Sequence, residues 1–159
     1  MMNTEITYEQ LSVLNAAYAK CIDEDRLEFW PEFFLDDCQY KITTAENVQQ
    51  GMAAGLVYAD SKRMLQDRVT ALREANIYER HWYRHIVSMP TIIGRVPNGL
   101  SVESPFLLAR ITRGGKMDLF ATGKYLDLIA PDTDGNLKFA ERIVVCDSCS
   151  IDTLLAIPI

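Results

Sequence analysis

The sequence predicts an α+β fold in which N-terminal helices pack on a long, strongly curved antiparallel sheet. Apolar residues recur at helical spacing in the first half of the chain, and from Trp82 onward they alternate with polar residues. Runs of ten to fourteen alternating residues with short turns between them indicate an antiparallel meander. Strands of that length must coil because sheets twist. We expect all 159 residues to form one domain.

The first helix is predicted to run from residue 8 to residue 23. Thr7 and Gln10 have the spacing of a capping box, and apolar residues follow at helical spacing. The charged run Asp23-Glu24-Asp25 should end this helix.

A dense aromatic group follows, which we expect to bury a short helix against the sheet rather than to form a ligand box. Its members are Phe29, Trp30, Phe33 and Phe34. After the turn formers Asp36-Asp37, apolar and polar residues alternate from Cys38 to Thr43, which predicts a half-buried strand.

Two further helices are predicted before the sheet. Residues 47–59 should form a short helix, loosened by Gly51 and Gly55. A longer helix should begin after Asp60 or Ser61, with a wide apolar arc that seeks neighbours on more than one side. The innermost residues of that arc are Leu65, Val69 and Leu72.

Four long strands complete the predicted fold, separated by Pro-, Asn- and Gly-containing turns. They are Trp82–Arg95, Leu100–Arg113, Lys116–Ile129 and Leu137–Asp147.

Composition excludes several classes of function. Apolar residues make up 48% and charged residues 24%, as in ordinary globular proteins. A net charge of −6 without a basic stripe argues against nucleic acid. No apolar run reaches the roughly 20 residues that span a bilayer, and the start MMNTEITYEQ lacks a secretory signal. We therefore expect a soluble cytoplasmic protein whose four cysteines are reduced.

The two histidines, His81 and His85, have H-x-x-x-H spacing, which would suit a metal on a helix but not on a strand. Because Trp82 is predicted to begin a strand, we expect a buried, hydrogen-bonded His85 rather than a metal ligand. Cys146 and Cys149 form a lone C-x-x-C, for which neither a redox helix nor a second zinc-binding pair is evident.

A general acid–base pair is the most serious catalytic option, because a buried Asp or His with a shifted pKa can move a proton on a bound substrate. The candidates are Asp23, Asp36, Asp37, Tyr18, Tyr40 and His85. The three aspartates also have structural explanations as turn formers or helix terminators. No Ser-His-Asp spacing, Walker loop or dinucleotide glycine motif occurs.

Several motifs resemble the small (β) subunit of Rieske-type aromatic-ring-hydroxylating oxygenases, over nearly the whole chain. They are Met64–Arg73 (MLQDRVTALR), Tyr83–Ser88 (YRHIVS), Phe34-x-Asp36-Asp37-x-x-Tyr40 and Ala140-Glu141-Arg142-Ile143-x-x-Cys146-Asp147-Ser148. Met89 departs from the Asn that many members carry. Residues 71–90 look most similar to the terephthalate dioxygenase and salicylate 5-hydroxylase small subunits.

The resemblance implies a fold similar to the cone of nuclear transport factor 2, which the order of elements in residues 14–43 also resembles. It implies an α3β3 hexamer whose large subunit carries the Rieske [2Fe–2S] cluster and the mononuclear Fe(II), served by a reductase or ferredoxin. The complex would use NADH and O2 to hydroxylate an aromatic carboxylate such as salicylate or terephthalate. The β subunit would be chiefly structural, with no catalytic, cofactor-binding or metal-binding residue. The sequence is consistent with a β subunit that holds neither iron site, because it contains no C-x-H motif and only two histidines.

We expect structural or assembly roles for Arg68, Arg84 and His85 and for the apolar tail, in a trimer of this chain that caps three large subunits. The tail residues are Leu154, Leu155, Ile157 and Ile159. Two alternatives stay open, namely a stand-alone isomerase or dehydratase with an Asp/His pair, and a homo-oligomeric binding module.

Overall fold

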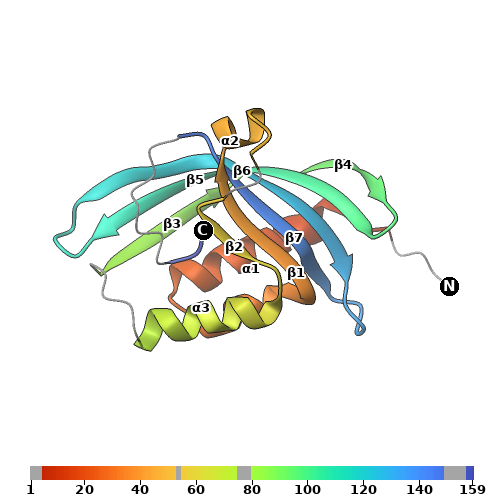
Figure 1. The fold of residues 1–159 in the computed structure, drawn as a ribbon, viewed down its shortest axis with the longest axis horizontal. Helices are drawn as coiled ribbons and strands as arrows, with labels where there is room; N and C mark the ends of the chain where they lie inside the picture. The colour runs from red at the N-terminus through yellow and green to blue at the C-terminus, as the bar shows by residue number, and fades with distance from the viewer. Residues whose placement is uncertain (1–4, 53–54, 75–79, 149–156) are drawn as a thin grey trace.

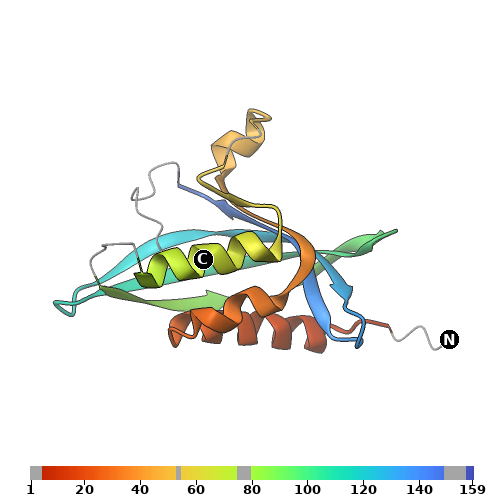
Figure 2. The same cartoon turned by 60° about the horizontal axis from the view of Figure 1, so that its bottom comes forward.

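The computed structural model describes residues 5–52, 55–74, 80–148 and 157–159. Helices α1 and α3 and the 3₁₀-helix η1 lie on the concave side of a long, twisted sheet, as Figure 1 shows. Figure 2 shows that the short helix α2 stands on the other side of the sheet. Within the described residues, no helix is long and apolar enough to cross a membrane.

Helix α1 (Tyr8–Asp23) has the predicted bounds. Its capping box is formed, because the Gln10 backbone N–H donates to Thr7 Oγ1 (3.2 Å) and the Thr7 N–H donates to Gln10 Oε1 (2.9 Å). The predicted apolar face is buried, and Leu11 and Tyr18 are fully covered. Asp25 follows with a φ of 58°, a left-handed conformation that turns the chain into η1.

The aromatic group lies on η1 (Leu27–Phe33) and the start of β1 (Phe34–Thr44). Trp30 and Phe34 are buried in edge-to-face contact, with ring centroids 5.7 Å apart. Phe29 does not join them, since 63% of its surface is exposed. The prediction is therefore wrong for Phe29, which falls on the outer side of the 3₁₀ turn.

The predicted helix over residues 47–59 is only partly present. Helix α2 spans Ala45–Gln49, and β2 spans Val57–Ala59 and pairs with β1 in antiparallel fashion. Gly51 has a φ of 65°, which ends the helix. Gly55 lies against β1, where an added Cβ would come within 2.7 Å of the Ile42 carbonyl oxygen. Glycine at this position therefore permits the strand pairing that replaces the helix.

Helix α3 spans Lys62–Glu74 and begins where expected, because the Met64 N–H donates to Ser61 Oγ at 3.2 Å. The predicted inner stripe is buried, namely Leu65, Val69 and Leu72. Arg73 binds the turn before η1. Its guanidinium donates to Glu28 Oε1 (2.7 Å), to Asp25 Oδ1 (2.9 Å) and to the Asp25 carbonyl oxygen (2.9 Å).

The remaining strands are β3 (His81–Val87), β4 (Thr91–Val96), β5 (Gly99–Thr112), β6 (Met117–Pro131) and β7 (Leu137–Cys146). The order in the sheet is β2-β1-β7-β6-β5-β3, and β4 also pairs with β5. The single strand predicted over Trp82–Arg95 is thus two strands along one edge of β5, separated by the segment 88–90, which includes Pro90.

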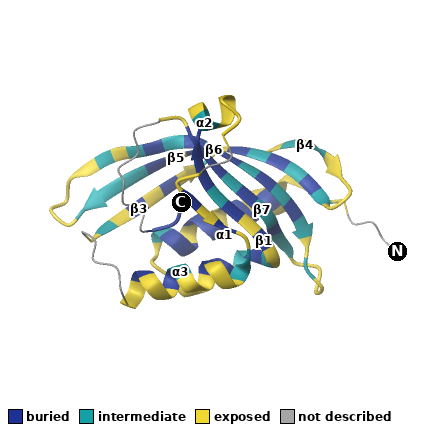
Figure 3. Ribbon diagram, viewed as in Figure 1, coloured by how far each residue is buried: buried dark blue, intermediate teal, exposed yellow. Residues whose placement is uncertain are grey.

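The sheet is mixed rather than wholly antiparallel, because β1 pairs with β7 in parallel. The expected antiparallel meander is correct for β5, β6 and β7. Figure 3 shows buried residues along these strands and on the helix faces turned toward them.

Candidate functional site

The last residue of α1 and the middle of β3 form a buried Asp–His pair. Asp23 Oδ1 lies 2.6 Å from His85 Nδ1, and Asp23 Oδ2 accepts from the His85 backbone N–H at 2.9 Å. The side chains are 5% and 0% exposed. The Asp23 carboxylate thus binds both the ring and the backbone N–H of His85. These two contacts join α1 to β3, a strand at the edge of the sheet. The sequence singled out both residues as candidates for an acid–base pair, and the structure brings them together.

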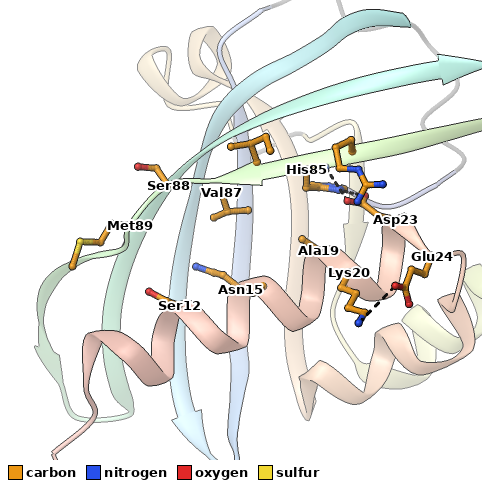
Figure 4. Close-up of a pocket in the computed structure, with 13 residues that line it drawn as sticks. Ser12, Asn15, Ala19, Lys20, Asp23, Glu24, His85, Val87, Ser88 and Met89 are labelled. Atoms are coloured by element: carbon orange, nitrogen blue, oxygen red, sulfur yellow. Dashed lines mark hydrogen bonds and ion pairs between the residues drawn. The ribbon is translucent and has the colours of Figure 1, made fainter.

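The pair borders a groove of about 570 Å³ between α1 and β3 (Figure 4). Its other labelled lining residues in Figure 4 include Ser12, Asn15, Ala19, Lys20, Glu24, Val87, Ser88 and Met89. Lys20 and Glu24 are paired at 3.7 Å across one turn of the helix. His85 is among the lining residues, but its side chain is 0% exposed to solvent.

His81 and His85 lie on one face of β3, with the ring of Tyr83 between them. The His81–Tyr83 centroid distance is 5.0 Å and the Tyr83–His85 distance is 6.0 Å. Within the part of the chain that the structure describes, no three His, Cys, Asp or Glu side chains gather as metal ligands. As predicted, His85 is buried and hydrogen-bonded.

A fully buried ion pair lies deeper in the cone. Arg142 on β7 donates through Nε and Nη2 to the two carboxylate oxygens of Asp127 on β6, each at 2.8 Å. Arg142 Nη2 also donates to Asn15 Oδ1, and Asn15 Nδ2 donates to Ser104 Oγ at 3.1 Å. Burial by itself lowers the pKa of Arg142, but the Asp127 carboxylate more than offsets this, so the net pKa is raised and the guanidinium stays charged.

Three aromatic rings enclose the Arg142 guanidinium. Its carbon Cζ lies 3.8 Å from the ring centroids of both Tyr125 and Phe139 and 4.3 Å from that of Tyr18. Cation–π contact of this kind stabilises a guanidinium that has lost its water. The centre of the cone is thus filled by this chain's own side chains.

Sequence patterns did not predict the pairing of Asp127 with Arg142, although a signal was present. In β6, Tyr125, Asp127 and Ile129 alternate on the buried side. A charged residue at a core position of a predicted strand implies a buried partner, because an unpaired charge there is too costly.

The end of the described chain lies inside the cone as well. The carbonyl oxygen of Ile159 accepts from the hydroxyls of Tyr18 (2.9 Å) and Tyr40 (3.0 Å). Desolvation raises the pKa of both tyrosines, so these hydroxyls keep their protons and act as donors. Ile157 and Ile159 are buried in the core of their own chain, while Leu154 and Leu155 lie outside the described residues. A role of this tail in assembly stays a prediction.

The other candidates lie apart from the Asp–His pair. Asp36 and Asp37 are exposed on β1. Arg68 is half-buried on α3, and Arg84 is exposed on β3, so their proposed assembly roles stay predictions.

The cysteine motif is only partly described. Burial raises the pKa of the Cys146 thiol to about 11, which does not favour the thiolate that a redox cysteine requires. Cys149, the second cysteine of the motif, lies outside the described residues.

Comparison with known proteins shows what the chain is similar to. The family model described as "Ring hydroxylating beta subunit" matches residues 17–153. The chain is 50% identical to subunit beta 1 of the terminal oxygenase component of terephthalate 1,2-dioxygenase from Comamonas sp., over 94% of this chain and 97% of that one. It is 38% identical to the anthranilate 1,2-dioxygenase small subunit of Burkholderia cepacia, over 96% and 94% of the two chains.

Solved structures agree with the sequence comparisons. A crystallised β subunit assigned to an aromatic-ring-hydroxylating dioxygenase of Novosphingobium aromaticivorans superimposes with a TM-score of 0.85 and 38% identity, covering 96% of both chains. The expected α+β cone similar to nuclear transport factor 2 is therefore confirmed. The chain belongs to the family of β subunits of aromatic-ring-hydroxylating dioxygenases.

Proposed function

We propose that this chain is a structural subunit that performs no chemistry of its own. In this proposal, a large subunit carries the Rieske [2Fe–2S] cluster and the mononuclear Fe(II), and three copies of each subunit form an α3β3 hexamer in the cytoplasm. A reductase or ferredoxin supplies electrons from NADH, and O2 is used to hydroxylate an aromatic carboxylate.

The filled centre of the cone is the observation that carries the structural role. Arg142 is fully buried, with Asp127 and three aromatic rings around it, where a catalytic cone would need space for a substrate. Such a buried network stabilises one arrangement of the helices on the sheet and leaves the outer surfaces to bind partners.

The donor set of this chain does not fit either iron site. A Rieske centre takes two cysteines and two histidines, and a mononuclear oxygenase iron takes two histidines and a carboxylate. The whole sequence has two histidines, His81 and His85, and Tyr83 lies between their rings. We therefore assign both iron sites to the partner.

The substrate class is proposed from the relatives. Terephthalate and anthranilate, named for the dioxygenases of two relatives, are both aromatic carboxylates. Salicylate belongs to the same class and is retained as a candidate.

Co-expression with the large subunit from the neighbouring reading frame tests the proposal. We expect one complex of equal stoichiometry that hydroxylates an aromatic carboxylate, with all iron retained on the large chain after separation. The chain purified alone under anaerobic conditions should be colourless and contain far less than one iron per chain. Stoichiometric iron on the isolated chain, or failure of the two chains to associate, would refute it.

The Asp23–His85 pair favours a second candidate, a stand-alone dehydratase or isomerase. Its 2.6 Å contact resembles the orientation of a general base by a carboxylate. The complete covering of the His85 ring speaks against it, because a base must reach the proton that it abstracts. Turnover of a hydroxylated cyclic substrate by the isolated chain, lost in His85→Gln, would support this alternative.

A further inference from the structure

A second groove, the hairpin groove, opens at the end of the cone where α1 begins. Figures 1 and 2 show the β4–β5 hairpin, the β6–β7 hairpin and the start of α1 at this same end of the molecule. Residues of all three segments line the groove, which measures about 710 Å³. Binding sites for small molecules span about 300–1,000 Å³, so the hairpin groove is large enough to hold one.

The deepest residues of the hairpin groove are apolar and belong to the core. Leu100 and Ile129 pair across β5 and β6 and are 3% and 1% exposed. Ile6 and Leu137 are partly buried against the same core, and Val96 lies at the rim with 41% of its surface exposed. An apolar ligand body placed here would displace water from these side chains, which favours binding.

The β4–β5 hairpin holds the rim of the groove close to β6. Gly99 pairs with Val96, so Pro97-Asn98 is the two-residue turn of the hairpin. Gly99 has a φ of 150°, and an added Cβ would come within 2.4 Å of the Ile129 carbonyl oxygen. Glycine therefore allows β5 to start directly against β6. The same turn places the side chains of Arg95 and Asn98 at the groove.

Arg95 gives the groove a positive charge. It is the one charged residue among the described residues that line the groove. In the part of the chain that the structure describes, its guanidinium makes no ion pair or hydrogen bond. Asn98 adds a side-chain amide, which can donate as well. The groove thus combines apolar walls with a small group of donors, an arrangement typical of sites for small molecules.

Carboxylates on neighbouring segments do not neutralise Arg95. Glu5, Glu9 and Asp134 are exposed and do not line the groove. The Asp132 carboxylate binds the backbone of its own turn, where Oδ1 accepts from the Asp134 N–H at 2.9 Å. The charge of Arg95 is therefore available to an anionic ligand.

We propose that the hairpin groove binds a small aromatic carboxylate, with its ring against Leu100 and Val96 and its carboxylate on Arg95 and Asn98. The two parallel N–H donors of a guanidinium match the two oxygens of a carboxylate. A single cation suits a ligand with one negative charge, whereas a chain of phosphates would need several cations. The choice of an aromatic acid rests on the substrate class in the proposed function, and the groove itself requires an apolar body with one anionic end.

Amide NMR on the isotope-labelled full chain tests this inference, with anthranilate as the probe. We expect a dissociation constant on the order of 1 mM, as for a ligand of about ten heavy atoms in an open site. The shift changes should centre on the backbone N–H groups of Gly99, Gly135 and Leu137, which line the groove. Anthranilamide has the same ring with a neutral amide, and it should bind at least about fivefold more weakly.

Two variants with matched controls locate the site. Arg95→Gln should weaken anthranilate binding at least about fivefold, while Arg113→Gln removes one exposed charge from the β5–β6 turn and should leave it unchanged. Val96→Glu places a carboxylate at the rim and should abolish binding. Val13→Glu makes the same change at an exposed residue of α1 outside the groove and should not. An otherwise unchanged amide spectrum shows that each variant is folded.

Three results would overturn the inference. They are the absence of shift changes at about ten times the expected dissociation constant, shift changes centred outside the groove, and equal weakening by Arg95→Gln and Arg113→Gln. Equal affinity for anthranilamide would overturn recognition of the carboxylate.

Failure of this inference is distinguishable from failure of the proposed function. A chain that assembles with the large subunit into an active complex but shows no anthranilate binding in the groove would overturn the inference alone. Anthranilate bound in the groove of a chain that never associates with a large subunit would overturn the proposed function alone.

Discussion

Removing the charge of Asp127 should destabilise the protein more than any comparable change on its surface. Asp127→Asn keeps the size of the side chain but takes the carboxylate away from Arg142, which donates to it twice at 2.8 Å. The side chains of both residues are 0% exposed. Breaking a buried ion pair by removing one partner costs about 3–5 kcal/mol, because the remaining buried charge has lost its counter-ion. For a chain of this size that corresponds to a fall in melting temperature of about 10 °C.

The assay is chemical and thermal unfolding followed by circular dichroism, with a control on the same strand. Asp118→Asn makes the same substitution in a surface pair with Lys116 at 3.6 Å and should cost less than about 1 kcal/mol. The double variant Asp127→Leu with Arg142→Met removes both charges and should recover most of the loss. If Asp127→Asn were no more destabilising than Asp118→Asn, the argument that this pair organises the cone would fail.

Three further predictions concern smaller regions. Arg73→Met should cost about 1 kcal/mol at pH 7, since the contacts that it breaks are partly exposed. The hydrogen bond from Arg73 holds the pKa of Glu28 below its ordinary 4.5, so the stability difference should be fully present above pH 4.5 and shrink as the pH falls through the lowered value, leaving the part that comes from the Asp25 carbonyl oxygen; a difference that does not shrink as Glu28 becomes protonated would contradict this. His85→Ala should cost about 1–3 kcal/mol by leaving Asp23 without its ring partner, while His81→Ala should leave hydroxylation by the complex nearly unchanged; normal assembly with lost turnover in either variant would instead indicate catalysis. Ile159→Asp should lower the melting temperature, because it places a charge at a fully buried position beside two tyrosine hydroxyls; unchanged unfolding would show that this end of the chain is not held in the cone.

Local interactions explain why several elements were predictable. The capping box of α1 is closed between Thr7 and Gln10, and the helix begins and ends at the residues expected. Alternation of apolar and polar residues located β5, β6 and β7 to within a few residues. Motifs spread over most of the chain also carried the family resemblance, which the comparisons confirm.

Interactions between distant segments explain what sequence patterns missed. The parallel pairing of β1 with β7 joins residues about 100 positions apart and leaves no local pattern. The break between β3 and β4 is a slip in register against β5 across the segment that contains Pro90, because Val87 pairs with Phe106 and Thr91 pairs with Glu103. Gly55 permits a strand contact with β1 where residue spacing favoured a helix.

The sequence by itself determined the secondary structure of α1, α3 and the long strands, the family, and the shortage of iron ligands, because each depends on residue type and short-range spacing. Tertiary structure alone decided the partners of the buried charges. Asp23 and His85 are 62 residues apart, and Arg142 lies 127 residues from Asn15. An unpaired buried charge costs several kcal/mol, so each buried charge needs a partner. The packing of α1 across the sheet decides which residues those partners are.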